Sequence, residues 1–443
     1  MQKKYILISI LFFCQINADA QSLNKLMSDA KNFKDIETKL KKNEKILENA
    51  SQKEQKYYNR WKWFWNTRVD SSGSFERYNT EMNNYLNKIY PTGHVDNVSL
   101  KSASLSWTCL GPNSRPVGTR REIGRGRIRP IWVNPDKTNS ILIGSNSGGL
   151  WKTTNGGDNW TCLTNNLMTG GVFDIAVNPN DTNIIYIATG TRLTPNGDLG
   201  MSNNYSLGIF KSIDGGSSWT KLNIATSTGE HFRGIVIKRA DTSILYALSS
   251  DKVYKSTDSG SSWTTTPLTI STGQLLTDII FKPNDPNTIY VSGYQNAIYK
   301  STDAGANWIN LAPNMLSLFA NSRIAIATNP EVSNELYAFY CNVDEPSQDN
   351  IIEKSIDGGN TWDTIITEYL TGVHYAIVLK LSPEGDIYAG GINLWKSTDG
   401  GNTFPDVLRS SNIHVDFMDI EFPDPNDNDL IYVTTDGGVY MDD

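Results

Sequence analysis

Arginine side chains are concentrated in one short stretch of this chain, between residues 115 and 129. The stretch contains Arg115, Arg120, Arg121, Arg125, Arg127 and Arg129. A guanidinium group is planar and binds a carboxylate through two parallel hydrogen bonds. We therefore predict that Arg125 and Arg127 take part in ligand binding.

Three aspartates recur in one setting, each followed by isoleucine near the start of an apolar segment. They are Asp174, Asp278 and Asp419. Two interpretations fit this pattern. The carboxylates line a central channel and contact a ligand, or they form hydrogen bonds between neighbouring repeats, as buried polar groups that recur with a repeat usually do. Both interpretations stay open, and all three residues are candidate ligand contacts.

Two longer segments between predicted strands carry further charged residues. Thr191–Leu207 contains Arg192 and Asp198, and Asn342–Asn350 contains Asp344 and Glu345. Long loops on a rigid scaffold are the usual place for recognition, although they can also be tolerated surface insertions. We therefore add these four residues to the predicted ligand contacts.

A repeated sequence box must position all of these residues. It reads Ser-x-Asp-x-Gly-x-Ser-Trp, as in Ser212–Trp219, and returns about every 40 to 60 residues, a spacing typical of propeller blades. Glycine supplies the positive φ of a tight turn, the aspartate bonds the turn backbone, and the tryptophan buries a large ring. The copies are Thr153–Trp160, Ser212–Trp219, Ser256–Trp263, Ser301–Trp308, Ser355–Trp362 and Ser397–Phe404.

Apolar segments around the boxes read as four strands per repeat. The first strands are predicted to start near residues 128, 172, 233, 276, 323, 374 and 416. The sequence therefore predicts an all-β fold, a seven-bladed β-propeller of four-stranded antiparallel blades. Helical apolar spacing over residues 21–90, for example Phe33, Ile36 and Leu40, predicts a short helical segment before it.

The last repeat ends at Asp443, before its fourth strand. Ser106–Leu110 copies Asn159–Leu163, the predicted fourth strand of the first blade. We therefore expect a strand that starts at Trp107 to complete the last blade and close the ring, which removes open sheet edges. The alternative is that the natural chain continues past Asp443 into more blades.

The box resembles the Asp-box, or BNR repeat, of sialidases, xyloglucanase-type glycosidases, the sortilin N-terminal domain and secreted bacterial propellers. This resemblance implies that the boxes lie on the rim away from the ligand face. Gly144–Trp151 is similar to a xyloglucanase segment, but Asn146 stands where those enzymes carry an aspartate. An amide cannot act as a general base, and Arg127-Ile-Arg-Pro130 matches the sialidase arginine motif only loosely.

Composition limits the remaining possibilities. The net charge of −7 argues against general nucleic-acid binding, and the four histidines and four cysteines show no metal-binding spacing. Residues 1–20, with Lys3 and Lys4 before an apolar run and Ala18-Asp-Ala20 after it, read as a secretory signal peptide rather than a membrane anchor. Residues 21–90 form the helical segment, 91–105 a linker and 106–443 the propeller.

These patterns favour an exported binding or scaffold protein, secreted, at the cell surface or periplasmic. It would recognise an extracellular protein, peptide or glycan on its long-loop face, without a cofactor, a metal, nucleic acid or a transmembrane segment once the signal is removed. The alternative is a glycoside hydrolase or lyase that uses Asp or Glu from those loops and acts on extracellular polysaccharide. No catalytic residue can be assigned, and the sequence predicts neither the ligand nor the oligomeric state.

Overall fold

The computed structural model of the chain describes residues 32–42, 45–48, 50, 55, 58–59, 62, 94–95, 127–146, 148–165, 167, 171–190, 206–224, 230–295, 297–311, 322–342, 350–366, 376–404, 413–424 and 430–442. The predicted signal peptide and the predicted closing strand at Trp107 lie outside the described residues, as does most of the predicted helical segment over residues 21–90. The chain divides into two compact units, Met1–Pro91 with Asp198–Met201, and Thr92–Gly197 with Ser202–Asp443.

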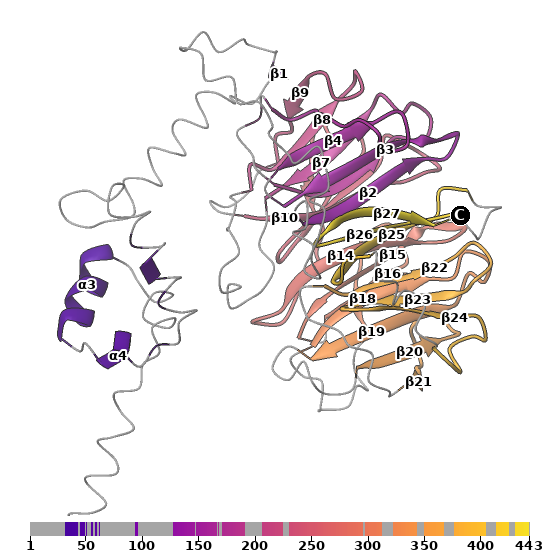
Figure 1. Cartoon of the computed structure of the whole chain (residues 1–443). Coiled ribbons are helices and arrows are strands. Elements are labelled where there is room, and N and C mark those ends of the chain that lie inside the picture. The colour runs from indigo at the N-terminus through magenta and orange to yellow at the C-terminus, as the bar shows by residue number, and fades with distance from the viewer. Residues whose placement is uncertain are drawn as a thin grey trace, which may run out of the picture. The chain divides into compact units, whose positions relative to one another are not determined.

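The first unit contains helices α3 (Phe33–Lys42) and α4 (Lys45–Glu48) (Figure 1). Phe33, Ile36 and Leu40 are buried on one face of α3, as their spacing predicts, and Tyr58 packs on Ile36 and Leu40. The carboxamide oxygen of Asn32 accepts a hydrogen bond from the Lys34 N–H, which caps the start of α3. The helices described by the structure are too short or too polar to span a bilayer.

The second unit consists of antiparallel sheets, and each group of strands is named here by its first strand. The first groups are β2 (Ile128–Asn134), β3 (Lys137–Ser145), β4 (Gly149–Thr153), β5 (Thr161–Cys162); β6 (Val172–Val177), β7 (Ile185–Thr189), β8 (Ile209–Ser212), β9 (Trp219–Lys221); and β10 (Phe232–Ile237), β11 (Leu245–Ser249), β12 (Val253–Ser256), β13 (Thr264–Thr265). The later groups are β14 (Leu275–Lys282), β15 (Asp285–Tyr294), β16 (Ile298–Ser301), β17 (Ile309–Asn310); β18 (Ser322–Thr328), β19 (Leu336–Asn342), β20 (Ile351–Ser355), β21 (Asp363–Ile366); β22 (Val378–Leu381), β23 (Ile387–Gly390), β24 (Leu394–Ser397); and β25 (Phe417–Glu421), β26 (Ile431–Thr435), β27 (Gly438–Asp442).

Within each group the strands pair in chain order. The β14 and β18 groups are joined into one sheet by the pair Tyr294 and Arg323. The described residues of the β22 and β25 groups supply three strands each. Strand β22 begins at Val378, after an isolated bridge at Ala376, and the predicted start near 374 lies outside the described residues.

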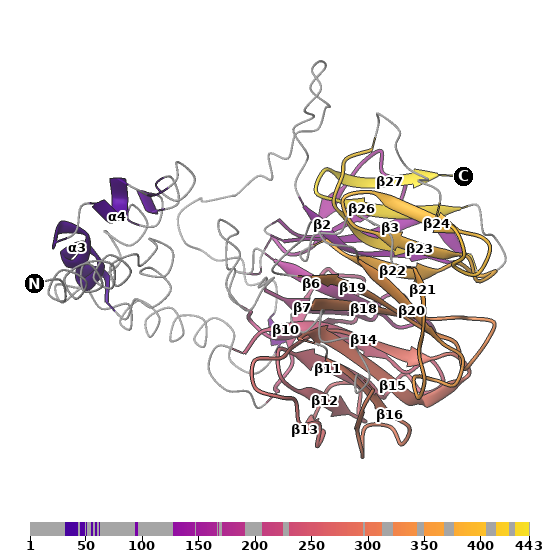
Figure 2. The same cartoon turned by 90° about the horizontal axis from the view of Figure 1, so that it is seen from below.

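The first strands of the groups form the interior of the unit (Figures 1 and 2). Strand β2 contacts β6, β6 contacts β10, β10 contacts β14, and the series continues through β18 and β22 to β25. Strand β25 in turn contacts β2, and β26 contacts β2 as well. The sheets are therefore arranged about a common axis, with their first strands innermost.

Part of the predicted linker is a strand. His94 and Val95 form β1, which pairs antiparallel with Thr220 and Trp219 on β9. Strand β9 is the outer edge of its group, and an edge strand offers unpaired N–H and C=O groups to any extended segment that reaches it. Within the predicted linker, residues 91–105, these two positions therefore form a strand contact with the β6 group.

The repeated boxes form the tight turns that their residue types predict. The Ser212 hydroxyl donates to Asp214 Oδ1 (2.8 Å) and accepts from the Gly216 N–H (2.8 Å). Asp214 also accepts from the N–H and hydroxyl of Ser218, and Gly215 and Gly216 have φ of 69° and 93°. The same serine bonds recur at Ser256, Ser301, Ser355 and Ser397.

Tyrosines of β7, β11 and β15 connect their groups to the next group. The Tyr186 hydroxyl and the Lys211 ammonium both donate to the Ser259 carbonyl, at 3.1 and 3.0 Å, in the box of the following group. Equivalent pairs reach the carbonyls of Ala304 and Gly358. These three box turns therefore have a second role, since a carbonyl of each anchors the preceding sheet.

Candidate functional site

The candidate site lies where the inner strands start. Ile128 pairs with Ser145, Val172 with Thr189 and Ser322 with Asn342, so first strands begin where second strands end. The connections from second to third strands leave from that same end, which is called the start face here. Both long segments therefore attach to the start face, while the box turns lie at the opposite end.

Five predicted contacts lie outside the described residues. They are Arg125, Arg192, Asp198, Asp344 and Glu345. The remaining predicted contacts are Arg127, Asp174, Asp278 and Asp419, and the structure places all of them on or just before inner strands.

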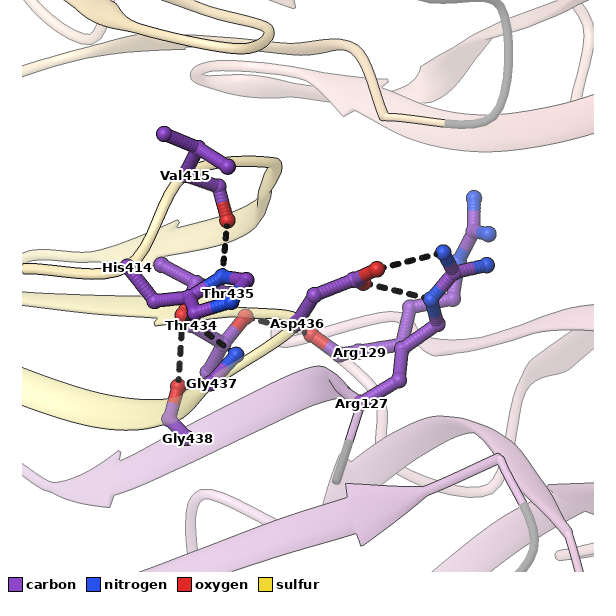
Figure 3. A network of polar contacts seen from close by, with 9 residues as sticks. All are labelled: Arg127, Arg129, His414, Val415, Thr434, Thr435, Asp436, Gly437 and Gly438. Carbon is purple, nitrogen blue, oxygen red and sulfur yellow. Dashed lines mark hydrogen bonds and ion pairs between the residues drawn. The ribbon is translucent and has the colours of Figure 1, made fainter. Parts of the chain in front are cut away.

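Arg127 lies just before β2 and is engaged by Asp436, in the turn between β26 and β27 (Figure 3). Its Nη2 donates to Asp436 Oδ2 at 2.6 Å, and its Nε donates to Oδ1. The Arg127 side chain is only 9% exposed. Next to this pair, the Thr434 hydroxyl donates to the Arg129 carbonyl at 2.9 Å. Arg127 therefore ties the first sheet to the last, a partner that its sequence context did not indicate.

Asp174 and Asp419 form hydrogen bonds between neighbouring sheets. Oδ2 of Asp174 on β6 accepts the N–H of Ile235 on β10 at 2.8 Å. Oδ2 of Asp419 on β25 accepts the N–H of Ile131 on β2 at 3.2 Å. The interpretation of these two aspartates as contacts between repeats is confirmed.

Asp278 has a different local partner. Its Oδ2 accepts a hydrogen bond of 2.6 Å from the hydroxyl of Thr277, the residue before it on β14. A register shift at this point, between Leu276 and Asp278, leaves Thr277 outside the regular pairing. Such bulges redirect side chains near functional sites, and similar shifts follow Val172, Phe232 and Phe417.

Burial dominates the electrostatics of these carboxylates. It raises the pKa of Asp174 to about 7, against the opposing effect of the N–H groups of Ile235 and Ile175. Burial likewise raises the pKa of Asp419 to about 6, and the nearby Lys380 ammonium opposes the rise. Both groups therefore change protonation near neutral pH, unlike ordinary aspartates.

Three arginines on alternate inner strands were not predicted as contacts. Arg129, Arg233 and Arg323 are the second residues of β2, β10 and β18 and are 8%, 3% and 2% exposed. The signal was present in the sequence, because an arginine stands at or next to three of the predicted strand starts. It went unused because Arg233 and Arg323 are isolated in sequence.

Asn146, the residue that departs from the xyloglucanase pattern, also lies on the start face. It follows β3, and its N–H donates to the Arg127 carbonyl at 3.3 Å. Among the described residues, no group of three or more His, Cys, Asp or Glu side chains is arranged to hold a metal ion.

A groove of about 630 Å³ lies at the outer strands of the β6 and β10 groups. Its lining includes Lys211, Ile213 and Lys221 on one side and the box residues Ser259–Ser261 on the other. This groove belongs to the box end of the sheets, away from the charged residues of the start face.

The comparisons with known proteins agree on the fold. The family described as Sortilin, neurotensin receptor 3 (Sortilin-Vps10) matches residues 207–353 and 250–389. No curated protein matches the sequence.

Solved structures match most of the chain at low identity. The GH74 xyloglucanase from Xanthomonas campestris is 17% identical with a TM-score of 0.57, over 71% of this chain and 52% of that one, so this chain spans about half the xyloglucanase. YCF48 from Cyanidioschyzon merolae is 13% identical with a TM-score of 0.52, over 73% of this chain and 97% of that one. YCF48 bound to D1 peptide is 15% identical with a TM-score of 0.51, over 72% of this chain and 93% of that one.

These likenesses establish the fold and not the activity, because all three identities are low. Together with the axial arrangement of four-stranded antiparallel sheets, they show that the second unit is a β-propeller.

Proposed function

We propose that this chain is an exported β-propeller that binds an extracellular protein, peptide or glycan on its start face. In this proposal the propeller has seven blades, six of which carry the Asp-box, and the strand from Trp107 completes the last blade. The contacts between β25 and β2 support a closed ring, and the three-stranded β25 group leaves an edge for that strand. Residues 1–20 would direct the chain to the cell surface or beyond.

One observation favours binding over catalysis: the described carboxylates of the start face are already engaged in contacts between sheets. Asp174 and Asp419 accept backbone N–H groups from neighbouring inner strands, and Asp436 is held by Arg127. A glycosidase pair must instead face the scissile bond from two sides. The YCF48 structure with a bound D1 peptide supports a propeller of this size as a peptide receptor.

The direct test is a screen of the purified chain on glycan and peptide arrays, with a matched pair of surface variants. Asp251→Lys changes an exposed start-face residue, and Glu331→Lys changes an exposed residue in the turn between β18 and β19, at the opposite end. We expect binding to change in Asp251→Lys and to stay the same in Glu331→Lys. Loss of binding in Glu331→Lys alone would place the site on the opposite end.

The second candidate function is a glycoside hydrolase. The raised pKa values of Asp174, about 7, and Asp419, about 6, favour it, because a general acid must be protonated near working pH. The similarity in fold to a xyloglucanase is consistent with it. Release of reducing sugar from any polysaccharide, abolished in Asp174→Asn or Asp419→Asn, would overturn the binding proposal.

A further inference from the structure

The three buried arginines of the start face come from alternate inner strands. Arg129, Arg233 and Arg323 are the second residues of β2, β10 and β18, and β6 and β14 lie between these strands. Three guanidinium groups, each more than nine-tenths buried, are costly to hold in one region unless anionic groups compensate them. The presence of three buried arginines on the start face of the propeller therefore needs an explanation.

The arginines are close enough to affect one another. Burial is the largest cause that lowers the pKa of Arg129, to about 9, and the charges of Arg323 and Arg233 lower it further. Asp278 and Tyr294 act in the opposite direction. The Arg129 guanidinium also stacks over the ring of Phe173 on β6, 4.2 Å from its centroid. Side chains of four other strands therefore influence this guanidinium electrostatically, and Phe173 of a fifth strand contacts it.

The described carboxylates near the arginines already accept other hydrogen bonds, since Asp174 and Asp419 hold the N–H groups of Ile235 and Ile131. Burial also raises the pKa of Asp174 to about 7 and that of Asp419 to about 6, which weakens their negative charge at neutral pH. Asp278 is left as the third carboxylate, and its Oδ2 already accepts the Thr277 hydroxyl. Among the described residues, no hydrogen-bond partner reaches Nη1 of the buried Arg129. Arg129 therefore has a buried donor to spare.

We propose that Arg129, Arg233 and Arg323 form a receptor for a tetrahedral oxyanion, a phosphate or sulfate group, at the centre of the start face. A planar carboxylate has two oxygens and is satisfied by one or two guanidinium forks. A phosphate or sulfate group offers oxygens in several directions, which suits donors that approach from three strands. This inference rests on the proposed binding function and names the chemical group that the ligand presents.

The first test uses the whole chain and simple ions. Thermal unfolding and titration calorimetry at pH 7 compare sodium phosphate and sodium sulfate with sodium acetate and sodium chloride at equal ionic strength. A ligand that binds only the folded state raises the unfolding midpoint, so we expect phosphate or sulfate to raise it more than acetate or chloride. Equal effects of all four salts, or the largest effect from acetate, would overturn the inference.

Variants locate the site. Arg129→Gln removes the charge and the fork, and we expect phosphate or sulfate affinity to fall about tenfold to a hundredfold, the usual cost of a charged hydrogen bond. Arg239→Gln is the matched control, because Arg239 is exposed beyond the other end of β10. If Arg129→Gln fails to fold, Arg233→Lys keeps the charge and loses the fork, and the same loss is expected. Unchanged affinity in the folded variant would contradict the proposal.

Titrations with monoesters show whether the phosphate or sulfate group belongs to a peptide or to a glycan. They also test the oxyanion receptor separately from the proposed binding function. O-phosphoserine, glucose 6-phosphate and glucose 6-sulfate are titrated in turn, and the ester that competes with the free ion identifies a peptide or glycan origin. Competition by none of the esters, with the free ion still bound, assigns the receptor to the inorganic ion. Array ligands that bind the start face without competition from phosphate or sulfate would overturn the oxyanion receptor and leave the proposed function standing.

Discussion

The guanidinium group of Arg127 and the carboxylate of Asp436 join the start of β2 to the turn before β27, through two parallel hydrogen bonds. The two residues are 309 positions apart in the chain. The pair therefore holds the first sheet of the propeller against the last.

We expect Arg127→Lys to lower the free energy of unfolding by about 1–3 kcal/mol, because lysine keeps the charge but cannot form the two-pronged contact. The measurement is urea unfolding at pH 7. Asp436→Asn is the partner variant, and the double variant should cost less than the sum of the single ones. Simple additivity would show that the two side chains do not act together.

Tyr432 provides a second contact between the last and first sheets. Its hydroxyl donates to the Thr138 carbonyl at 3.1 Å. We expect Tyr432→Phe to cost about 1 kcal/mol, the net worth of one hydrogen bond, in urea unfolding. The matched control is Tyr186→Phe, which should cost less, because Lys211 still donates to the Ser259 carbonyl in that variant. A larger cost for Tyr186→Phe would contradict this assignment.

The pKa of Asp174 predicts a stability change with pH. Because the folded pKa, about 7, lies above the usual unfolded value of about 4, the native state binds the proton more tightly between these limits. The contribution of Asp174 to the free energy of unfolding is therefore complete below the unfolded pKa of about 4. It is lost as pH rises towards the folded pKa of about 7. The slope cannot exceed about 1.4 kcal/mol per pH unit for one proton.

The measurement is urea unfolding from pH 5 to 8. Asp174→Asn keeps an oxygen acceptor for the Ile235 N–H and cannot titrate, so its profile should be flatter than that of the wild type. Asp251→Asn, at an exposed carboxylate, should leave the slope unchanged. Parallel profiles for wild type and Asp174→Asn would show that Asp174 does not titrate in this range.

Gly260 in the third box turn has φ of 88°, and an added Cβ would lie 2.8 Å from Leu222 Cδ1. We expect Gly260→Ala to cost about 2–4 kcal/mol, the sum of backbone strain and overpacking. Gly156→Ala is the control, since Gly156 has φ of 68° and nothing within 4 Å of the added Cβ. It should cost only the strain, about 1–2 kcal/mol. Equal losses in thermal unfolding would mean that contact with Leu222 is unimportant.

Local residue chemistry was sufficient to predict the repeating architecture. Gly215 and Gly216 permit the positive φ of the turn, and Asp214 bonds the backbone within four residues. These contacts depend only on nearby sequence, as does the helical spacing of Phe33, Ile36 and Leu40. The contact between sheets made by Asp174 could also be anticipated, because it recurs with the repeat.

The candidate site depended on the tertiary structure. Arg129, Arg233 and Arg323 are far apart in sequence, and only the arrangement of β2, β10 and β18 about one axis brings their charges together. The partner of Arg127 could not be predicted either, because nothing in the sequence distinguishes Asp436 from the other aspartates. Only the contact between the last sheet and the first brings the two side chains together. The hydrogen bonds of a tight turn depend on residues that are close in sequence. Charge clusters and pKa values depend on burial and on distances between side chains, which only the folded chain defines.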